Sequence, residues 1–439
     1  MIRQTVLGFK LEGTKEELTA HGGLALMAEY NHGLGLRALV DRYLPGPGSN
    51  RGYDPSVFVD SLVLMLQGGG RSLEDLRELE REGALMKLIG REQIPDPDSM
   101  GDWLRRMGDS DRGQAGLIGL GQVRDVLNQR ILRHDGIVEY TLDADAMQVE
   151  AEKREAQYTY QGVRGYMPMG GFLFETGVCL LDEFREGNVP PQAGQLTFYR
   201  GCKQRMPWGK RIARYRGDSA SYGYELINEL ETDGVVWAIT ADQDSAVQAA
   251  IFAMAEGEWK EPVPGCGYEI AETVHSMQKT HKAFRLVVKR WVKPQRNLFE
   301  TDRRGYAYHV VASNWPAEAK SAYEVLVWHN QRGQAENFNK ELKSGFGLEQ
   351  MPCGQFSANA VFFRIGVIAY NLFIGFKRLS CPEAWGHHTI GTFRWKLIQV
   401  AGRIVRHAGR VILKLVVDAQ TLWHFERIRH KCFELCVAV

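Results

Sequence analysis

Two aspartates alternate along one predicted strand, and a third aspartate follows another. The run over 137–151 alternates and is rich in strand formers, which predicts a strand carrying Asp143 and Asp145. Side chains two positions apart on a strand share a face, and a buried carboxylate is costly unless it is paired, solvated or bound to a metal. The run over 211–221 predicts a strand that leads into a turn, and Asp218 at the end of that strand fits either the N-cap of the next helix or a site at the strand ends.

A later helical segment carries charged residues at regular spacing. His329, Arg332, Glu336 and Lys343 are separated by three, four and seven positions, so they fall along one face of a helix. That face fits either solvated salt bridges or one carboxylate beside phosphate-binding cations. Three carboxylates from separate segments can bind two Mg²⁺ ions, or Mn²⁺ in their place, and such a pair serves phosphodiester chemistry.

The overall composition limits the classes of protein to consider. The 439 residues include 54 Lys and Arg against 53 Asp and Glu, so contacts with nucleic acid must come from local patches. Seven scattered cysteines without a CxxC pair argue against a zinc ribbon or a disulfide framework and favour a reducing cytosol. We expect no signal peptide. The apolar run at 358–376 contains Arg364 and two asparagines, which favours a buried core helix over a membrane span.

The elements that must position these residues divide the chain into five parts. Residues 1–135 predict short helices with tight turns, typical of either a DNA-binding or a packing domain. Strands and helices at 136–243 predict the first part of a mixed α/β core. Residues 244–317 predict a β-rich insertion, 318–400 a second, helical part of the core with the Glu336 helix, and 401–439 a basic C-terminal region.

The acidic and helical motifs together resemble bacterial insertion-sequence transposases of the DDE type. The motifs are Asp145 in LDADAMQ, Asp218 in RGDS, and HNQRGQAENFNKELK at 329–343. One branch of these enzymes has the signature Y-(2)-R-(3)-E-(6)-K, and the present chain keeps its spacing with His329 in place of tyrosine. The stretches GYMPMGG, FREGN and GFGLEQMPCGQFSANAVFFRIGVIAYNL also fit this branch, and the resemblance covers most of residues 20–415.

The resemblance implies a fold and a catalytic site. The fold is an α/β RNase H-like mixed sheet with a β-rich insertion and a helical N-terminal domain that binds DNA. Asp145, Asp218 and Glu336 are the implied catalytic residues and ligands of two Mg²⁺ ions. Asp143 is a rival metal ligand, but Asp145 better keeps the D-A-x frame of the family.

The same resemblance implies an activity and partners. It predicts Mg-dependent cleavage at the ends of an insertion sequence and strand transfer into target DNA, by cut-and-paste, with hairpin ends as one route. The partners are double-stranded DNA at terminal inverted repeats and at the target, and a second copy in a synaptic complex. The expected location is the cytoplasm, at the bacterial nucleoid, with no membrane. The alternatives are a non-catalytic, element-derived DNA-binding protein or repressor, and a nuclease that does not join ends.

Basic residues interleaved with aromatic ones predict the DNA contacts, because cations bind phosphates and aromatic rings stack on unpaired bases. Trp291 or Trp315 is the candidate for holding a flipped base. A second basic run at 403–431 fits either a DNA-binding tail or ordinary helix faces. The predicted DNA-binding residues are Arg105, Arg106, Lys289, Arg290, Trp291, Lys293, Arg296, His329, Arg332, Lys340 and Lys343.

Overall fold

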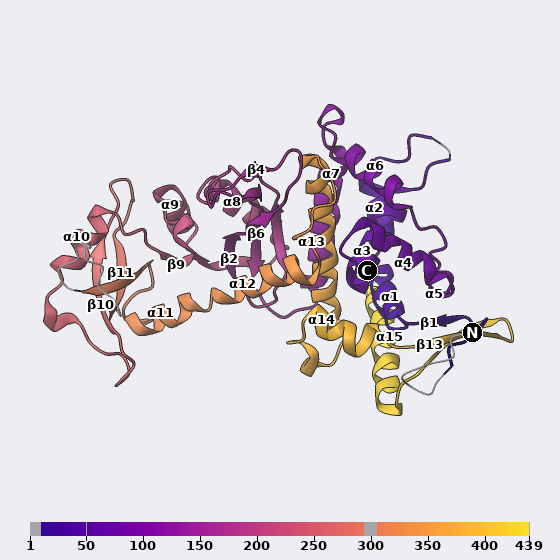
Figure 1. Cartoon of the computed structure of the whole chain (residues 1–439). Coiled ribbons are helices and arrows are strands. Elements are labelled where there is room, and N and C mark those ends of the chain that lie inside the picture. The colour runs from indigo at the N-terminus through magenta and orange to yellow at the C-terminus, as the bar shows by residue number, and fades with distance from the viewer. Residues whose placement is uncertain (1–9, 50, 294–304, 439) are drawn as a thin grey trace.

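The computed structural model describes residues 10–49, 51–293 and 305–438. Its N-terminal part is helical, as the sequence predicts (Figure 1). The helix α3 starts at a proline and ends where Gly69 adopts a positive φ of 119°. The short strand β1 and the helices of this part are β1 (Leu18–Thr19), α1 (Leu24–Gly33), α2 (Leu36–Tyr43), α3 (Pro55–Gly68), α4 (Leu76–Arg81), α5 (Gly83–Leu88), α6 (Pro97–Gly108) and α7 (Ala115–Arg133).

An eight-stranded mixed sheet forms the centre of the molecule. Its strand order is β10-β11-β12-β9-β8-β2-β6-β7, and β2, β8 and β9 are parallel to one another. The order of β2, β6, β7, β8 and β9 is that of an RNase H-like core, which confirms the predicted fold class. The bounds are β2 (Glu139–Ala146), β6 (Met169–Leu173), β7 (Cys179–Glu183), β8 (Arg211–Gly217), β9 (Val236–Thr240), β10 (Glu269–His275), β11 (Phe284–Val292) and β12 (Tyr306–Ser313).

The predicted β-rich insertion continues the core sheet. Its strand β12 pairs antiparallel with β9, from Val311 opposite Thr240 to Ser313 opposite Ala238. The hydrogen-bonded ladder therefore runs unbroken from the core into β12, β11 and β10. Figure 1 shows this end of the sheet at the left of the molecule, beside α10 (Ser245–Ala253).

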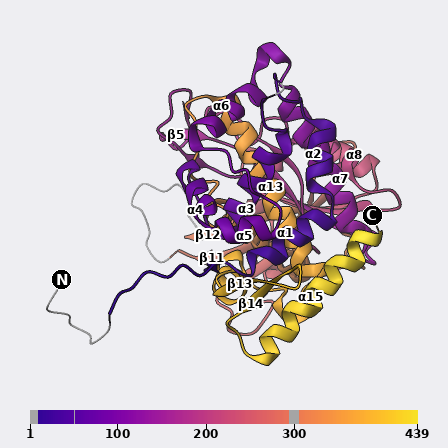
Figure 2. The same cartoon turned by 90° about the vertical axis from the view of Figure 1, so that its right-hand side faces the viewer.

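One long apolar helix, α13 (Phe356–Leu379), passes between the sheet and the N-terminal helices (Figures 1 and 2). It is long and apolar enough to cross a membrane, but 94% of its most apolar window is buried inside the protein. Its Asn371 side chain donates hydrogen bonds to Asn128 on α7 and to the carbonyl of Cys179 on β7, both at 2.8 Å. Because its polar side chains are paired within the protein, α13 is the buried core helix that the sequence predicts.

The remaining elements surround this core. α11 and α12 follow one another with a break at residues 331–332, and a π-helical turn at Glu341–Gly345 continues them. The C-terminal helix packs on α1, where Arg429 of α15 pairs with Glu29 at 2.7 Å, and the C-terminal hairpin pairs with β1 through β13. These elements are β3 (Val149–Glu150), β4 (Gln157–Tyr158), β5 (Arg164–Tyr166), α8 (Gln195–Arg205), α9 (Tyr224–Thr232), α11 (Ala322–Asn330), α12 (Gly333–Lys340), α14 (Ile390–Phe393), β13 (Gly402–His407), β14 (Arg410–Leu415) and α15 (Ala419–Ala438).

Candidate catalytic site

The ends of the parallel strands place two of the predicted aspartates side by side. β2 and β8 pair in parallel, with Asp143 opposite Arg216, so Asp145 and Asp218 both follow this pair at the carboxyl ends of adjacent strands. Asp218 also caps the next turn, where its Oδ1 accepts a hydrogen bond from the Ala220 amide at 3.0 Å. This edge of a parallel sheet is where ligands of open α/β folds bind.

The helix α12 brings the third predicted carboxylate to the same edge. Asn339 Nδ2 donates to Asp145 Oδ2 at 2.9 Å, which fixes the helix against β2. The guanidinium of Arg332 lies 3.9 Å from Asp145 Oδ1 and 3.6 Å from Glu336 Oε1. Arg332 therefore stands between the carboxylates of Asp145 and Glu336.

The carboxylates of this edge interact electrostatically. Burial, together with the charges of Asp218 and Glu336, raises the pKa of Asp145 to about 7 despite the opposing charge of Arg332. Burial also raises the pKa of Asp218, again opposed by Arg332. The site thus concentrates more negative charge than Arg332 neutralises.

The donor set fits a divalent cation in chemistry and in charge. All three candidate side chains are carboxylates, and oxygen is the ligand that Mg²⁺ and Mn²⁺ prefer. Among the described residues, no three His, Cys, Asp or Glu side chains converge closely enough to hold a metal ion as they stand. At this edge the Glu336 side chain is 66% exposed and pairs with Arg332. A bound cation would favour the charged form of Asp145, whose pKa is raised by burial and by the neighbouring carboxylates.

A cavity of about 810 Å³ opens beside Asp218. It is bordered by Gln195 of α8 and Glu225 of α9, and Asp242 beyond β9 also lines it. The Asp242 charge contributes to the raised pKa of Asp218. The carboxylate edge is therefore accessible from solvent, as a site for a large substrate must be.

The sequence matches the family described as Transposase DDE domain group 1 over residues 7–432, nearly the whole chain. The chain belongs to this transposase family. It is a DNA-cleaving transposase enzyme, of a class that generally uses divalent metal ions. A solved structure, the piggyBac transposase synaptic complex with hairpin DNA, matches with a TM-score of 0.46 and 11% identity over 86% of this chain and 79% of that one. No curated protein matches the sequence.

Asp143, the rival first ligand, is held inside the transposase by an ion pair. Arg216 Nε and Nη2 donate to its two carboxylate oxygens at 2.7 and 2.8 Å, and both side chains are fully buried. The same guanidinium donates through Nη1 to the carbonyl of Trp328 at 2.9 Å. Asp143 shares a strand face with Asp145, but its oxygens are already occupied.

His329 does not lie where a phosphate contact requires. It is only 3% exposed, and its Nε2 donates to the carbonyl of Gly217 at 3.2 Å. Burial lowers its pKa to about 4, so the ring is neutral at physiological pH. The prediction that His329 binds DNA with a charge that varies near neutral pH is therefore wrong, because the ring faces the protein interior.

The two lysines of this helical segment have different surroundings. Lys343 Nζ donates to the carbonyl of Gln148 at 2.7 Å, which ties the π-helical turn to the loop after β2. Lys340 is exposed on α12. Both lie on the helical segment that carries Glu336, and Lys340 is the freer of the two to reach a ligand.

On β11, only some of the predicted DNA contacts are accessible. Arg290 is 2% exposed and pairs with Glu269 and Glu256, each at 2.7 Å, so the prediction that it contacts DNA is wrong. Lys289 and Trp291 lie on the opposite face of the strand, with the Lys289 ammonium 5.6 Å from the Trp291 ring centre. Lys293 is half-buried just beyond the strand, and Arg296 lies outside the described residues.

The remaining predicted contacts are Arg105 and Arg106 on α6, and Trp315, which packs against α11. Arg105 is exposed and pairs with Asp102, and it lines a polar cavity of about 640 Å³ together with Lys153. Arg106 is half-buried on the same helix. Trp315 packs edge-on against Trp328 of α11, with ring centres 5.8 Å apart.

Sequence reasoning gave no role to two polar residues of the site. Helical spacing puts Asn339, three positions after Glu336, on the same face, but it does not indicate a hydrogen bond to Asp145. Asp242 follows β9 as Asp218 follows β8, and the shared position at a strand end was the available signal. Neither residue has a distinctive motif around it.

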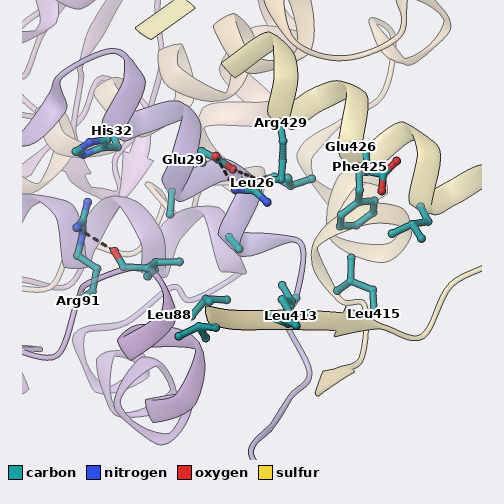
Figure 3. Close-up of a pocket in the computed structure, with 17 residues that line it drawn as sticks. Leu26, Glu29, His32, Leu88, Arg91, Leu413, Leu415, Phe425, Glu426 and Arg429 are labelled. Carbon is teal, nitrogen blue, oxygen red and sulfur yellow. Dashed lines mark hydrogen bonds and ion pairs between the residues drawn. The ribbon is translucent and has the colours of Figure 1, made fainter. Parts of the chain in front are cut away.

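A separate apolar cavity lies far from this edge (Figure 3). It has a volume of about 540 Å³ and is bordered by α1, the end of α5, β14 and α15. Leu413, Leu415 and Phe425 point into it, and the Glu29–Arg429 ion pair crosses one side. None of the predicted catalytic or DNA-binding residues lines this cavity.

Proposed function

We propose that this transposase cuts DNA at the terminal inverted repeats of a bacterial insertion sequence and joins the freed ends to target DNA. Asp145, Asp218 and Glu336 would hold two Mg²⁺ ions, with Mn²⁺ as a substitute. The observation that carries this proposal is that three distant chain segments reach one edge of the sheet: β2 and β8 pair in parallel, and Asn339 of α12 donates to Asp145. Burial, with the charges of Asp218 and Glu336, raises the pKa of Asp145 to about 7, which supports the proposal.

When bound, the ions supply charge neutralisation at the reacting phosphate and activation of the attacking oxygen. The side chains of the protein position the substrate around them. Arg332 has a planar fork of donors that suits phosphate oxygens, and its present carboxylate partners are held at 3.6 Å or more. Asn339 fixes the orientation of Asp145, and Lys340 and Lys343 offer positive charge along the same segment. Such catalysis depends on positioning and charge neutralisation.

The proposal extends to the course of the reaction. Water first cleaves a phosphodiester and frees a 3′-hydroxyl, which attacks the opposite strand to form a hairpin or attacks target DNA directly. Two copies of the chain would act together on paired ends at the bacterial nucleoid. Lys289 and Trp291, both half-buried on the same face of β11, are the proposed contacts with the end of the element.

The test uses purified protein and duplexes carrying the inverted repeats that flank the gene. Wild-type protein with Mg²⁺ is expected to cut at the repeat ends and to join them to a plasmid. Glu336→Gln protein is expected to bind the same duplexes without cutting them. Binding without cutting by the wild type in Mg²⁺ would instead indicate a repressor, and cutting without joining would indicate a nuclease.

A further inference from the structure

The charge of the chain is concentrated in one C-terminal segment. Residues 384–417 contain six Lys and Arg and no Asp or Glu, whereas the whole chain has a net charge of only +1. Four of these six residues, Arg403, Arg406, Arg410 and Lys414, lie in the hairpin of β13 and β14. The hairpin is therefore a local patch of the kind that binds a polyanion.

The base of the hairpin is the centre of a small three-stranded sheet, because β1 pairs with β13 at Gly402 and Arg403; beyond Ile404 only the two strands β13 and β14 continue. Six residues of β13 pair with six of β14, from Gly402 opposite Leu415 to His407 opposite Arg410, and the hairpin is about 20 Å long at the usual rise per residue. The turn consists of Ala408 and Gly409, both with positive φ. Figure 1 shows the hairpin extending outward at the right of the molecule, away from the central sheet.

The two faces of the ribbon differ in character. One face carries Ile404 and Leu413, which pack against the hydrophobic core, and, nearer the turn, the exposed Arg406 opposite Val411. The other face sets basic residues directly opposite one another: Arg403 faces Lys414, and His407 faces Arg410. Like charges placed opposite each other on neighbouring strands destabilise a sheet, and an anion bound between them removes that cost.

These basic side chains are available to a ligand. Arg406, Arg410 and Lys414 are exposed, and within the described part of the chain none of them forms an ion pair. Only Arg403 has a carboxylate partner, the exposed Glu16 at 3.0 Å. Beyond Ile404 the hairpin is a two-stranded ribbon, and a ribbon of this width fits the major groove of duplex DNA.

We propose that the β13–β14 hairpin is a second DNA-binding element, which holds duplex DNA through phosphate contacts from Arg406, Arg410 and Lys414. The inference rests on the proposed function, because it takes the bound DNA to be the substrate of the carboxylate edge. The hairpin lies beyond α1 and α5, on the side of α13 away from β2 (Figures 1 and 2). DNA bound there continues past the reacting phosphate, so the hairpin anchors a part of the substrate that is not cut.

The test measures equilibrium binding to a fluorescent duplex of arbitrary sequence, about three helical turns long, in EDTA at several salt concentrations. In the variant Arg406→Gln/Arg410→Gln/Lys414→Gln we expect the slope of log K against log salt to fall by about 2 to 3, with at least tenfold weaker binding at low salt. The matched control, Arg200→Gln/Lys203→Gln/Arg211→Gln, removes the same charge from exposed positions on α8 and β8. It should leave the slope within half a unit of the wild type.

Two further variants show whether a change in binding comes from the hairpin charges or from another cause. The single change Arg410→Gln lies next to the turn, where it does not disturb the core, and should lower the slope by about one. Asp145→Asn protein should bind with the wild-type slope, because the binding assay in EDTA does not depend on cleavage. The assay therefore tests DNA binding by the hairpin even if Asp145 proves not to be a catalytic residue. A wild-type slope in both hairpin variants would overturn the proposal. The proposal would also be overturned if the triple variant self-associated while its DNA binding stayed unchanged. The basic residues would then serve only to prevent the free edge of β14 from pairing with another copy of the chain.

Discussion

Arg216 donates hydrogen bonds to both carboxylate oxygens of Asp143 in a fully buried ion pair, from Nε at 2.7 Å and from Nη2 at 2.8 Å. The same arginine reaches the carbonyl of Trp328 near the end of α11. The pair thus joins β2 and β8 to the helix that precedes Arg332 and Glu336. Asp143 and Asp145 share one face of β2. Asp143 forms a structural ion pair, whereas Asp145 lies at the open edge of the sheet.

Breaking this pair is expected to destabilise the protein. Arg216→Met leaves the Asp143 carboxylate buried without its partner and should lower the free energy of unfolding by about 3–5 kcal/mol. The double variant Asp143→Leu/Arg216→Met should recover most of that loss, because well-packed apolar pairs often replace buried ion pairs at little cost. Urea denaturation measures both. Arg214→Met, on the same strand face but 29% exposed, is the control and should cost less than the single change; an Arg216→Met protein as stable as this control would contradict the structural role.

Arg332 should contribute to catalysis far more than to DNA affinity. Arg332→Lys keeps the charge but loses the planar fork of donors, and we expect cleavage to slow by about 100-fold. Duplex binding in EDTA should change less than about threefold, because one phosphate contact is a small part of a DNA interface. The measurements are single-turnover cleavage and fluorescence anisotropy, with Lys340→Gln as a comparison. Equal losses of affinity and rate would show that Arg332 serves only to bind DNA.

His329 should make the stability of the protein sensitive to acid. Its folded pKa, about 4, lies below its usual value, so the folded state binds fewer protons than the unfolded state between about pH 6.5 and 4. The contribution of His329 is complete above pH 6.5 and is lost as the pH falls through 4, by up to about 3 kcal/mol. In His329→Gln protein this part of the pH dependence of unfolding should disappear. An identical pH profile in the variant would show that the ring is not buried in its neutral form.

Sequence reasoning succeeded where local pattern and motif spacing decide the outcome. The alternation at 137–151 predicts a strand where β2 lies, and the spacing around Glu336 predicts a helix where α12 lies. It failed where burial depends on partners far away along the chain. In the sequence, Arg290 is a basic residue beside an aromatic one, as in a DNA contact. In the fold it is buried and forms ion pairs with Glu256 and Glu269. The position of His329 follows from Gly217, more than a hundred residues earlier.

The joining of β12 to β9 could not be predicted for the same reason. Strand patterns identify β10, β11 and β12, but pairing between β12 and β9 depends on which edges of the sheet stay free. As a result, the predicted insertion extends the core sheet and carries Lys289 and Trp291 on that extension. Their position relative to the carboxylates is a property of the folded sheet.

Asn339 should affect the metal requirement. Its side chain donates to Asp145 at 2.9 Å, so Asn339→Leu removes the bond that orients this carboxylate. Groups that orient metal ligands typically change metal affinity or activity by 10- to 100-fold, and we expect about tenfold more Mg²⁺ to be needed for half-maximal cleavage. A Mg²⁺ titration of cleavage measures this. The exposed neighbour Asn337→Leu is the control, and equal titration curves for both variants would exclude the orienting role.

Cleavage of inverted-repeat duplexes by Asp145→Asn, Asp218→Asn and Glu336→Gln proteins, beside wild type and Asp143→Asn, tests the central claim most directly. Each of the three variants should bind duplex in EDTA as the wild type does and lose at least about 1,000-fold in cleavage with Mg²⁺. Soluble, folded Asp143→Asn protein should keep more activity than any of them. Cleavage at the wild-type rate by any one of the three would show that its carboxylate is not part of the catalytic centre.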